Sequence, residues 1–447
     1  MNSRCRVAFA ALVLVLLAPG MTAAQLPEIS LADAARLALE WHPAARAADA
    51  TERAAGARLG QVSADRYPNL AVEGSAVRFQ EPMVVFPIHV LDPSRLEFNS
   101  MLIQSSLHLG YTLFDGGGRG STINSARSDL AGAAAARAAT EAQVIMAVTN
   151  AYLRVLSADA ALHALDQRLA AVEAERQRAS LLSAEGAAAA VESLRAAAAL
   201  QQTLADRAEA TAELRTATNE LARLTHIAAE QLTPDRLTDR GTGGADVPDR
   251  GWVITRLAEG NPVLAQAQSE ATAADWMRRA AAAAWFPRID LIGGYTLFGS
   301  ASGSFTGEWQ GGVRVTYPLF AGGKRPRAIA AAAARAEAVD ARVDATELDL
   351  ERGADRILAA LASTASRQTA LEAAERHLAE VVRIERLALD EGAGTQAEYL
   401  RAEAELSTVR ATVARTRHGA IALRVELAAL TGELSVAWLE TLTGVDR

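Results

Sequence analysis

The chain has 447 residues, of which 50% are hydrophobic and only 5% aromatic, and its formal net charge at pH 7 is −8. This length allows roughly two or three ordinary domains. The negative charge argues against nucleic acid as a partner, because contacts with phosphate groups require a basic surface.

Residues 1–24 have the pattern of a secretory signal peptide. A basic start with Arg4 and Arg6 precedes a short apolar run, and Thr22-Ala23-Ala24 offers a small-residue cleavage site. A retained N-terminal anchor is the alternative interpretation, but the run is too short to span a bilayer as a helix. Cys5 is the only cysteine and lies before this run, so we expect no disulfide in the processed chain.

Two helical stretches are predicted between Ser30 and Asp65, and Pro43 separates them. Two segments of alternating pattern follow, at about 69–79 and 105–114, with apolar side chains on one face and polar side chains on the other. Alternation with a period of two is typical of β-strands. The connection between the two strands contains prolines, so we expect it to be an exposed loop.

A glycine-rich stretch marks the end of the second predicted strand. It reads Tyr111-Thr-Leu-Phe-Asp-Gly-Gly-Gly-Arg-Gly120, and its key junction residues are Phe114, Gly116 and Gly117. Because glycine adopts positive φ without strain, this stretch is predicted to turn the chain sharply from a strand into a helix.

A helical pattern then covers 121–229 as one long antiparallel hairpin, which reverses at Glu185-Gly186. Much of this segment is alanine, the strongest helix former. Residues 232–251 contain prolines and glycines and are predicted to be a linker. They follow the first structural repeat, which we assign to 25–231.

The same plan is repeated in residues 252–447. Strands are predicted at about 288–299 and 308–319, and a long helical hairpin is predicted at 325–431. The reversal of this second hairpin falls at Glu391-Gly392. The equivalent junction residues are Phe320, Gly322 and Gly323.

Four short amphipathic strands cannot close a barrel by themselves, and an open sheet edge leaves backbone groups unpaired in lipid. A secreted chain with apolar-out, polar-in strands fits the pattern of outer-membrane strands, so several chains would have to close one barrel. A half-buried antiparallel sheet packed on helices of a soluble protein is the alternative. In the last long helix, the apolar seam from Val409 to Leu430 has the spacing of coiled-coil packing.

The tandem repeat, the two junctions and the two glycine turns, in this order and spacing, resemble the TolC-like outer-membrane efflux channels. The resemblance covers nearly the whole mature chain. It implies a mostly α fold with a small antiparallel β part, in which each repeat joins a β-hairpin to a long antiparallel helical hairpin. It also implies a homotrimer whose twelve strands form one outer-membrane barrel in contact with lipid, continued by an α-helical barrel in the periplasm.

The resemblance further implies that the chain is the exit duct of a tripartite efflux or type I secretion system. Such a duct is a passive conduit without a cofactor. It accepts cargo from an inner-membrane pump through a periplasmic adaptor protein, which docks at the helical tips. The tip residues are Leu182, Ser183, Glu185, Gly186, Leu389, Glu391 and Gly392.

Some members of the family carry two acidic residues, three positions apart, just after each turn, where they help to close or select at the tunnel entrance. At those positions this chain has Glu192 with Arg195 and Glu398 with Arg401. Residues three apart are neighbours on a helix, so each Glu and Arg could instead form an ordinary solvated ion pair. Both interpretations, a candidate periplasmic entrance and local ion pairs, stay open at this point.

No catalytic, cofactor-binding or metal-binding pattern is recognised, so we expect the chain not to be an enzyme. Gly116–Gly118 lacks the residue order of a phosphate-binding loop. The histidines are scattered without the spacing of a metal site. A periplasmic adaptor or a structural coiled-coil protein is the alternative function, although an adaptor is not expected to carry two full repeats of strand hairpin and helical hairpin.

Overall fold

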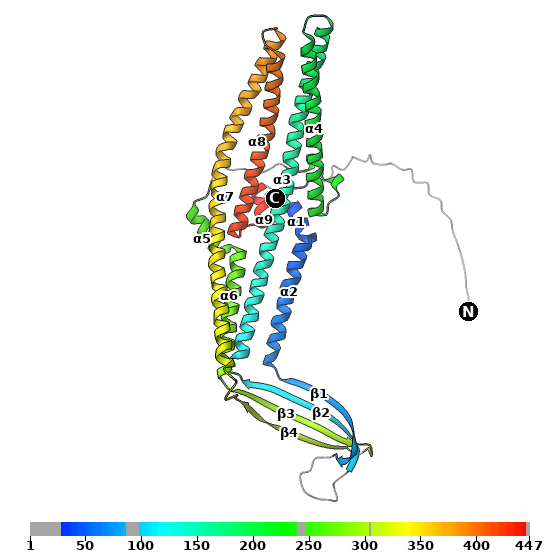
Figure 1. Ribbon diagram of the computed structural model, residues 1–447, viewed down its shortest axis with the longest axis vertical. Helices are drawn as coiled ribbons and strands as arrows, with labels where there is room; N and C mark the ends of the chain where they lie inside the picture. Colours follow the sequence, from blue (N-terminus) through cyan, green and yellow to red (C-terminus); the bar gives the residue numbers. More distant parts are fainter. Residues whose placement is uncertain (1–27, 86–97, 239–246, 304, 444–447) are drawn as a thin grey trace, which may run out of the picture.

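A computed structural model describes residues 28–85, 98–238, 247–303 and 305–443. The molecule is elongated, with the turns of two long helical hairpins at one end and a four-stranded sheet at the other (Figure 1). Short helices surround the long ones near the middle of its length (Figure 1). Among the helices within the described ranges, none combines the length and the apolar character that a membrane span requires.

The chain runs twice through the same series of helices. The first series is α1 (Leu31–Trp41), α2 (Pro43–Ser63), α3 (Gly118–Ala184) and α4 (Ala190–Thr225). The second series is α5 (Arg250–Gly260), α6 (Pro262–Ala282), α7 (Lys324–Asp390) and α8 (Gln396–Thr431), after which comes α9 (Val436–Thr443). Corresponding helices have equal lengths, with 67 residues in α3 and α7, 36 in α4 and α8, and 21 in α2 and α6. Each helical position in one repeat therefore has an equivalent in the other.

Side-chain caps fix where the short helices begin. The hydroxyl of Ser30 accepts a hydrogen bond of 3.1 Å from the N–H of Asp33 at the start of α1, as an N-cap serine is expected to do. Asn261 accepts two such bonds of 2.9 Å at the start of α6. Both α2 and α6 have proline at their first position, where the missing N–H has no helical partner in any case.

The end of the first helical hairpin differs from its predicted position at residue 229, because α4 ends at Thr225. His226 takes a left-handed conformation with φ 61°, and its ring stacks on Trp41 with centroids 5.7 Å apart. A left-handed residue cannot continue a right-handed helix. Neither glycine nor proline marks this end in the sequence. The predicted end of the helix therefore follows the alanine-rich pattern and lies beyond the observed one.

The strands β1 (Asn69–Val84), β2 (Phe98–Phe114), β3 (Arg288–Ser300) and β4 (Phe305–Thr316) form one antiparallel sheet in that order. The short turns η1 (Ala64–Arg66) and η5 (Ala283–Trp285) lead into β1 and β3. Because β1 and β4 each pair on one side only, the sheet has two open edges.

Three strands differ clearly from their predicted ranges. β1 continues past 79 to Val84, and β2 begins at Phe98 rather than at 105. Residues 86–97 of the predicted loop lie outside the described residues. Pro82 is accommodated because β1 is an edge strand with a register irregularity, where a sheet tolerates proline. β4 ends at Thr316 rather than at 319, since Pro318 has no N–H to donate to a strand ladder.

Cross-strand register gives the sheet one apolar and one polar face. One row runs across all four strands as Val72, Leu107, Tyr295 and Trp309, and these side chains are exposed at 75%, 39%, 46% and 78%. The adjacent row, on the opposite face, is Glu73, Ser106, Thr296 and Glu308. Successive side chains of a strand point to opposite faces, which confirms the predicted alternation.

Short elements pack against the middle of the long helices and form a hydrophobic core with them. We call these elements the collar: α1, α9 and the segment 229–237, which includes the turns η3 (Ala229–Gln231) and η4 (Pro234–Arg236). Leu232 and Leu237, from the segment predicted as a linker, are buried in it. The hydroxyl of Tyr152 in α3 donates to the carbonyl oxygen of Ile29 at 2.8 Å and so ties the collar to the long helix.

Candidate functional site

Both helical hairpins reverse through the same backbone motif. At the first tip, Gly186 has φ 70°, and the N–H of Ala187 donates to the carbonyl oxygen of Leu182 at 2.8 Å. At the second tip, Gly392 has φ 73° and is followed by an equivalent bond of 2.8 Å. This is the Schellman pattern, which ends a helix at a left-handed glycine. The two glycines selected from the sequence therefore terminate α3 and α7.

The tip residues selected from the sequence differ in exposure. Glu185, Gly186, Glu391 and Gly392 are exposed, and Leu182 and Ser183 are half-buried. Leu389 is only 5% exposed, so its side chain is packed inside the hairpin. The exposed leucines at the two tips are Leu181 at 64% and Leu387 at 54%, which occupy equivalent positions of the two repeats.

The helices that leave the two turns begin differently. Thr395 caps α8 in a capping box: its hydroxyl accepts from the N–H of Glu398 at 3.3 Å, and its own N–H donates to the Glu398 carboxylate at 3.2 Å. The Thr395 hydroxyl also donates to that carboxylate at 2.7 Å, and this bond is the main cause that lowers the pKa of Glu398. Ala189 stands at the equivalent position before α4 and provides no side-chain cap.

The two Glu and Arg pairs selected from the sequence do not form local ion pairs in the structure. Glu192 is half-buried and Arg195 is exposed, and no ion pair joins them. Glu398 and Arg401 are both exposed, and the carboxylate of Glu398 is directed to Thr395 instead. All four residues lie within the first two turns of α4 and α8, directly after the tips.

A polar contact that sequence reasoning missed links the two hairpins near their tips. Glu175 of α3 is fully buried, and its Oε1 accepts a hydrogen bond of 2.9 Å from Nε2 of Gln396 in α8. Arg178 forms an ion pair of 3.2 Å with the same carboxylate and also donates to the carbonyl oxygen of Leu389 at 3.0 Å. Such partners offset the cost of burying a carboxylate. The second hairpin is thereby held against the first.

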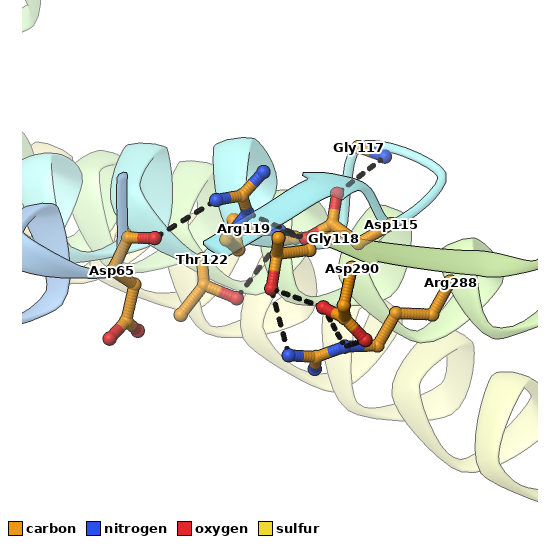
Figure 2. A network of polar contacts seen from close by, with 9 residues as sticks. Asp65, Asp115, Gly117, Gly118, Arg119, Thr122, Arg288 and Asp290 are labelled. Atoms are coloured by element: carbon orange, nitrogen blue, oxygen red, sulfur yellow. Dashed lines mark hydrogen bonds and ion pairs between the residues drawn. The ribbon is translucent and has the colours of Figure 1, made fainter. Parts of the chain in front are cut away.

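The first strand–helix junction is built around Asp115 (Figure 2). Its carboxylate accepts hydrogen bonds from the N–H of Gly117 at 3.2 Å and of Arg119 at 2.8 Å, and it pairs with the Arg119 guanidinium at 3.2 Å. Arg119 also donates to the backbone carbonyl oxygen of Asp65 at 2.9 Å. Asp115 therefore caps α3, and Arg119 ties this helix to the chain that enters β1.

The glycines of the first junction meet two separate requirements. Gly116 and Gly117 have φ 67° and 83°, a region that side chains disfavour. A Cβ added to Gly116 would also lie 2.6 Å from Cβ of Phe286 and 2.9 Å from the carbonyl oxygen of Ala283. The ring of Phe286 packs edge-on against Phe114, with centroids 6.4 Å apart. The chain can pass this close to η5 and Phe286 only because position 116 has no side chain.

The second junction follows the same backbone path with fewer contacts. Gly322 and Gly323 have φ 59° and 75°, and a Cβ at either position would meet open space. Ala321 stands where the first junction has Asp115, and α7 has no side-chain cap. Arg325 instead donates to the carbonyl oxygen of Pro318. Phe320 is 89% exposed, whereas its equivalent in the first junction contacts a ring.

Near the first junction, polar side chains also connect β2 and β3. The hydroxyl of Thr112 in β2 donates to the carboxylate of Asp290 in β3 at 2.8 Å. Arg288 donates to both of them, at 2.8 Å to the hydroxyl and 2.9 Å to the carboxylate; its contact with Asp290 is drawn in Figure 2. The polar face of the sheet is thus fixed where it meets the helices.

A groove of about 890 Å³ lies between α4 and α8, with α3 as its floor. Its lining carries both signs of charge, and ion pairs join Arg168 to Asp206 at 3.3 Å and Arg154 to Glu213 at 2.8 Å. Glu209 also lines it. The groove therefore combines ion pairs with apolar side chains such as Leu153 and Leu165.

The groove and the collar lie on opposite faces of α3. Tyr152 is buried in the collar, whereas Ala161 lines the groove. These residues are about two and a half helical turns apart, so their side chains leave α3 in opposite directions. The layer formed by α4, α3 and α8 consequently has a hollowed face with ion pairs and, on its other side, a face covered by the collar.

Within the described part of the chain, no cluster of three or more His, Cys, Asp or Glu side chains has the arrangement of a metal site. The distinctive parts of the described structure are a sheet with one apolar face, two helical hairpins that reverse at left-handed glycines, and a groove lined by ion pairs and apolar side chains.

A family model described as outer membrane efflux protein matches residues 34–225 and 253–433. The two matched segments correspond to the two series of helices and strands. A comparison with curated proteins gives no match.

Solved structures with the same fold include a membrane protein from Pseudomonas aeruginosa, with 23% identity, 91% of each chain covered and a TM-score of 0.79. The outer membrane protein VceC of Vibrio cholerae has 19% identity over 90% of this chain and 96% of its own, with a TM-score of 0.73. The open state of the MtrE outer membrane channel of Neisseria gonorrhoeae has 21% identity over 92% and 90%, with a TM-score of 0.74. At these identities the likeness establishes the fold.

Proposed function

The chain belongs to the outer membrane efflux protein family and resides in the outer membrane, and from this premise we propose that three copies form one channel. Family membership places the chain among efflux channel proteins rather than enzymes. In the proposed channel each chain contributes two repeats, which we assign to 25–231 and 252–447, and the connection 232–251 includes part of the collar and the start of α5. The signal peptide at 1–24, which lies outside the described residues, is removed during export.

The observation that carries this proposal is the two-faced sheet with open edges. A row of exposed apolar side chains, including Val72 and Trp309, crosses one face, and a polar row with Glu73 and Glu308 crosses the other. In lipid the unpaired backbone groups of an open edge are costly, and closing the sheet removes them. Three copies, with β4 of each beside β1 of the next, make a barrel of twelve strands with lipid outside and water inside.

The helices continue the channel on the periplasmic side. With 67 residues each, α3 and α7 are about 100 Å long at ~1.5 Å per residue. The hollowed face of the layer, which contains Arg154 and Asp206, lines the tunnel, because the collar occupies the other side. MtrE, a protein of the same fold, is described as a channel with an open state, which fits a duct that opens and closes.

The helical tips are the proposed docking site for a periplasmic adaptor protein, which connects the channel to an inner-membrane pump. Leu181 and Leu387 expose apolar side chains at equivalent positions and suit contacts with a partner. The carboxylates of Glu192 and Glu398, with Arg195 and Arg401 beside them, are proposed to line the entrance. Cargo then moves through a continuous wet path without a covalent step.

Single-channel recording in a planar bilayer tests this function. We expect stepwise conductance from the purified protein, and a weaker preference for cations after the double substitution Glu192→Gln/Glu398→Gln, because the entrance loses two carboxylates per chain. If the intact protein is closed, a variant with both hairpins shortened equally around Gly186 and Gly392 is expected to conduct. If the shortened variant is also silent, the channel function is wrong, whereas unchanged ion preference removes only the entrance assignment.

A further inference from the structure

Ion pairs fix how the α4 wall of the groove stands beside its floor. On the floor, Arg168 of α3 pairs with Asp206 of α4 at 3.3 Å, and Arg154 of α3 pairs with Glu213 of α4 at 2.8 Å. At ~1.5 Å per residue, the two arginines lie about 21 Å apart along α3. The stretch of α3 between them therefore runs beside residues 206–213 of α4. We call the part of the groove between these two ion pairs its middle.

The floor of the middle is apolar. Ala158, Ala161 and Leu165 line the groove between the two arginines. In the second repeat Arg367 stands in the position of Ala161, so this apolar floor belongs to the first repeat alone. The groove volume of about 890 Å³ is within the range of small-molecule sites, which are mostly apolar and carry a few polar groups.

The polar groups on both walls of the middle can only accept hydrogen bonds. On α4, Glu209 lines the groove between the two paired carboxylates and forms no ion pair in the described part of the chain. On α8, the hydroxyls of Thr408 and Thr412 each donate to a backbone carbonyl oxygen, at 2.9 and 2.8 Å. A hydroxyl whose hydrogen is engaged keeps only its acceptor lone pairs, and an ionised carboxylate has no donor.

The two threonines lie at the level of the apolar floor. The hydroxyl of Ser407 in α8 donates to the carbonyl oxygen of Ala164 in α3 at 3.2 Å, which places this part of α8 beside the same stretch of α3. The middle of the groove therefore offers a carboxylate on one wall and two hydroxyl acceptors on the other, with apolar side chains between them.

We propose that the middle of the groove binds an amphiphilic organic cation. Its ammonium group pairs with Glu209 and donates to the threonine hydroxyls, while its apolar body covers Ala161 and Leu165. The inference rests on the proposed function, because cargo reaches this face only if the face lines the tunnel. It adds a chemical class of cargo and a place in the duct where that cargo is retained.

Arg415 fixes the direction in which the cation binds. It lines the groove one helical turn beyond Thr412, is exposed, and is not ion-paired with any described residue. Its guanidinium repels a second positive charge, so the ammonium group is directed to the Glu209 end of the groove. An organic anion would instead bind at Arg415 and be repelled by Glu209.

Fluorescence anisotropy with two dyes of one ring system tests the proposal. With the protein in phosphatidylcholine nanodiscs, we expect saturable binding of the cation rhodamine 6G and none of the anion fluorescein. Glu209→Gln is expected to weaken rhodamine 6G binding about fivefold, as for a strong ion pair at a surface. Ala161→Trp fills the floor and is expected to abolish it. Arg415→Gln is expected to bind this dye at least as tightly as the unmodified protein.

Glu173→Gln is the matched control, because its carboxylate is exposed on α3 outside the groove, and unchanged binding is expected. Equal affinity of Glu209→Gln and the unmodified protein, or fluorescein binding that Arg415→Gln removes, overturns the proposed site. Channels that conduct but bind no rhodamine 6G overturn it as well and leave the channel function in place. Protein that binds the dye but stays silent in a bilayer, even with shortened hairpins, counts against the proposed function instead.

Discussion

Gln396 in α8 donates a hydrogen bond of 2.9 Å to Glu175 in α3, 221 residues earlier in the chain, and so joins the two helical hairpins near their tips. The carboxylate is fully buried and also pairs with Arg178 at 3.2 Å. Removing it leaves the buried amide of Gln396 without this acceptor, while Arg178 keeps only its bond to the carbonyl oxygen of Leu389.

We therefore expect Glu175→Ala to lower the free energy of unfolding by about 1–3 kcal/mol, the cost of leaving buried donors unsatisfied. Chemical denaturation followed by circular dichroism in detergent measures this change. Glu173→Ala is the matched control, because that side chain is exposed only two residues away, and it is expected to have little effect. Equal effects of the two substitutions would mean that the buried contact contributes nothing specific.

The two strand–helix junctions differ in one capping residue, and reciprocal substitutions at this position test its role. Asp115 accepts hydrogen bonds from two N–H groups at the start of α3, whereas Ala321 leaves α7 without a side-chain cap. We expect Asp115→Ala to destabilise the protein by about 1–2 kcal/mol and Ala321→Asp to stabilise it by a smaller amount, as for other N-caps. Denaturation midpoints measure both changes. A stabilising Asp115→Ala would contradict the capping role.

Equivalent glycines of the two junctions are expected to differ in their tolerance of a side chain. Gly116→Ala introduces a Cβ 2.6 Å from Phe286 as well as a strained φ, whereas Gly322→Ala meets open space and bears only the backbone strain. The strain costs about 1–2 kcal/mol and overpacking adds roughly 1–3 kcal/mol at position 116. The yield and thermal stability of folded protein compare the two variants. Equal losses would show that the close approach to Phe286 is not limiting.

Sequence periodicity was sufficient to predict the repeated order of strands and helices, because the features that define this order are local. Gly186 and Gly392 end their helices by adopting positive φ, and this preference is a property of glycine itself. Alternation in the strands likewise follows from backbone geometry, so the two faces of the sheet could be predicted. The ends of the strands were predicted less accurately, because a strand tolerates Pro82 only at the edge of a sheet, and the sequence does not show which strand is at the edge.

Contacts between distant segments were not predictable in the same way. Glu175 and Gln396 have no shared local pattern, and only folding brings them together. Comparison of the repeats offered one signal, since Glu175 and Arg178 stand where the second repeat has Val381 and Ile384. The capping role of Thr395 is visible in the sequence, because Thr395 and Glu398 have the capping-box spacing, which competes with a pairing of Glu398 and Arg401.

The start of α8 is expected to respond to pH. Hydrogen bonding by Thr395 lowers the pKa of Glu398 below its ordinary value of 4.5. A carboxylate whose pKa falls on folding stabilises the folded state above the unfolded pKa, and this contribution is lost as the pH falls through the folded pKa. We therefore expect the amide of Glu398 to lose protection against hydrogen exchange as the pH decreases below 4.5.

Thr395→Ala provides the control for this titration. It removes the hydroxyl that accepts from the N–H of Glu398 and donates to the carboxylate, so protection at Glu398 is expected to be low already at neutral pH and nearly independent of acidification. Exchange measured by NMR or mass spectrometry distinguishes the variants. The same pH profile with and without the hydroxyl would exclude the capping box as its cause.

The most direct test of the account is whether the hollowed face of the helical layer lines a conducting path. Thr216 lines the groove, and Thr211 lies on the same helix about 140° away. Both are exposed, and both hydroxyls donate to a backbone carbonyl oxygen at 2.8 Å, so cysteine replaces them under matched conditions.

In single-channel recordings of the Cys5→Ser protein, a sulfonate-bearing thiosulfonate reagent is expected to reduce the conductance of Thr216→Cys in discrete steps. The conductance of Thr211→Cys is expected to stay unchanged. A blocked Thr211→Cys channel with an unaffected Thr216→Cys channel would place the tunnel on the other side of the helices and contradict the account.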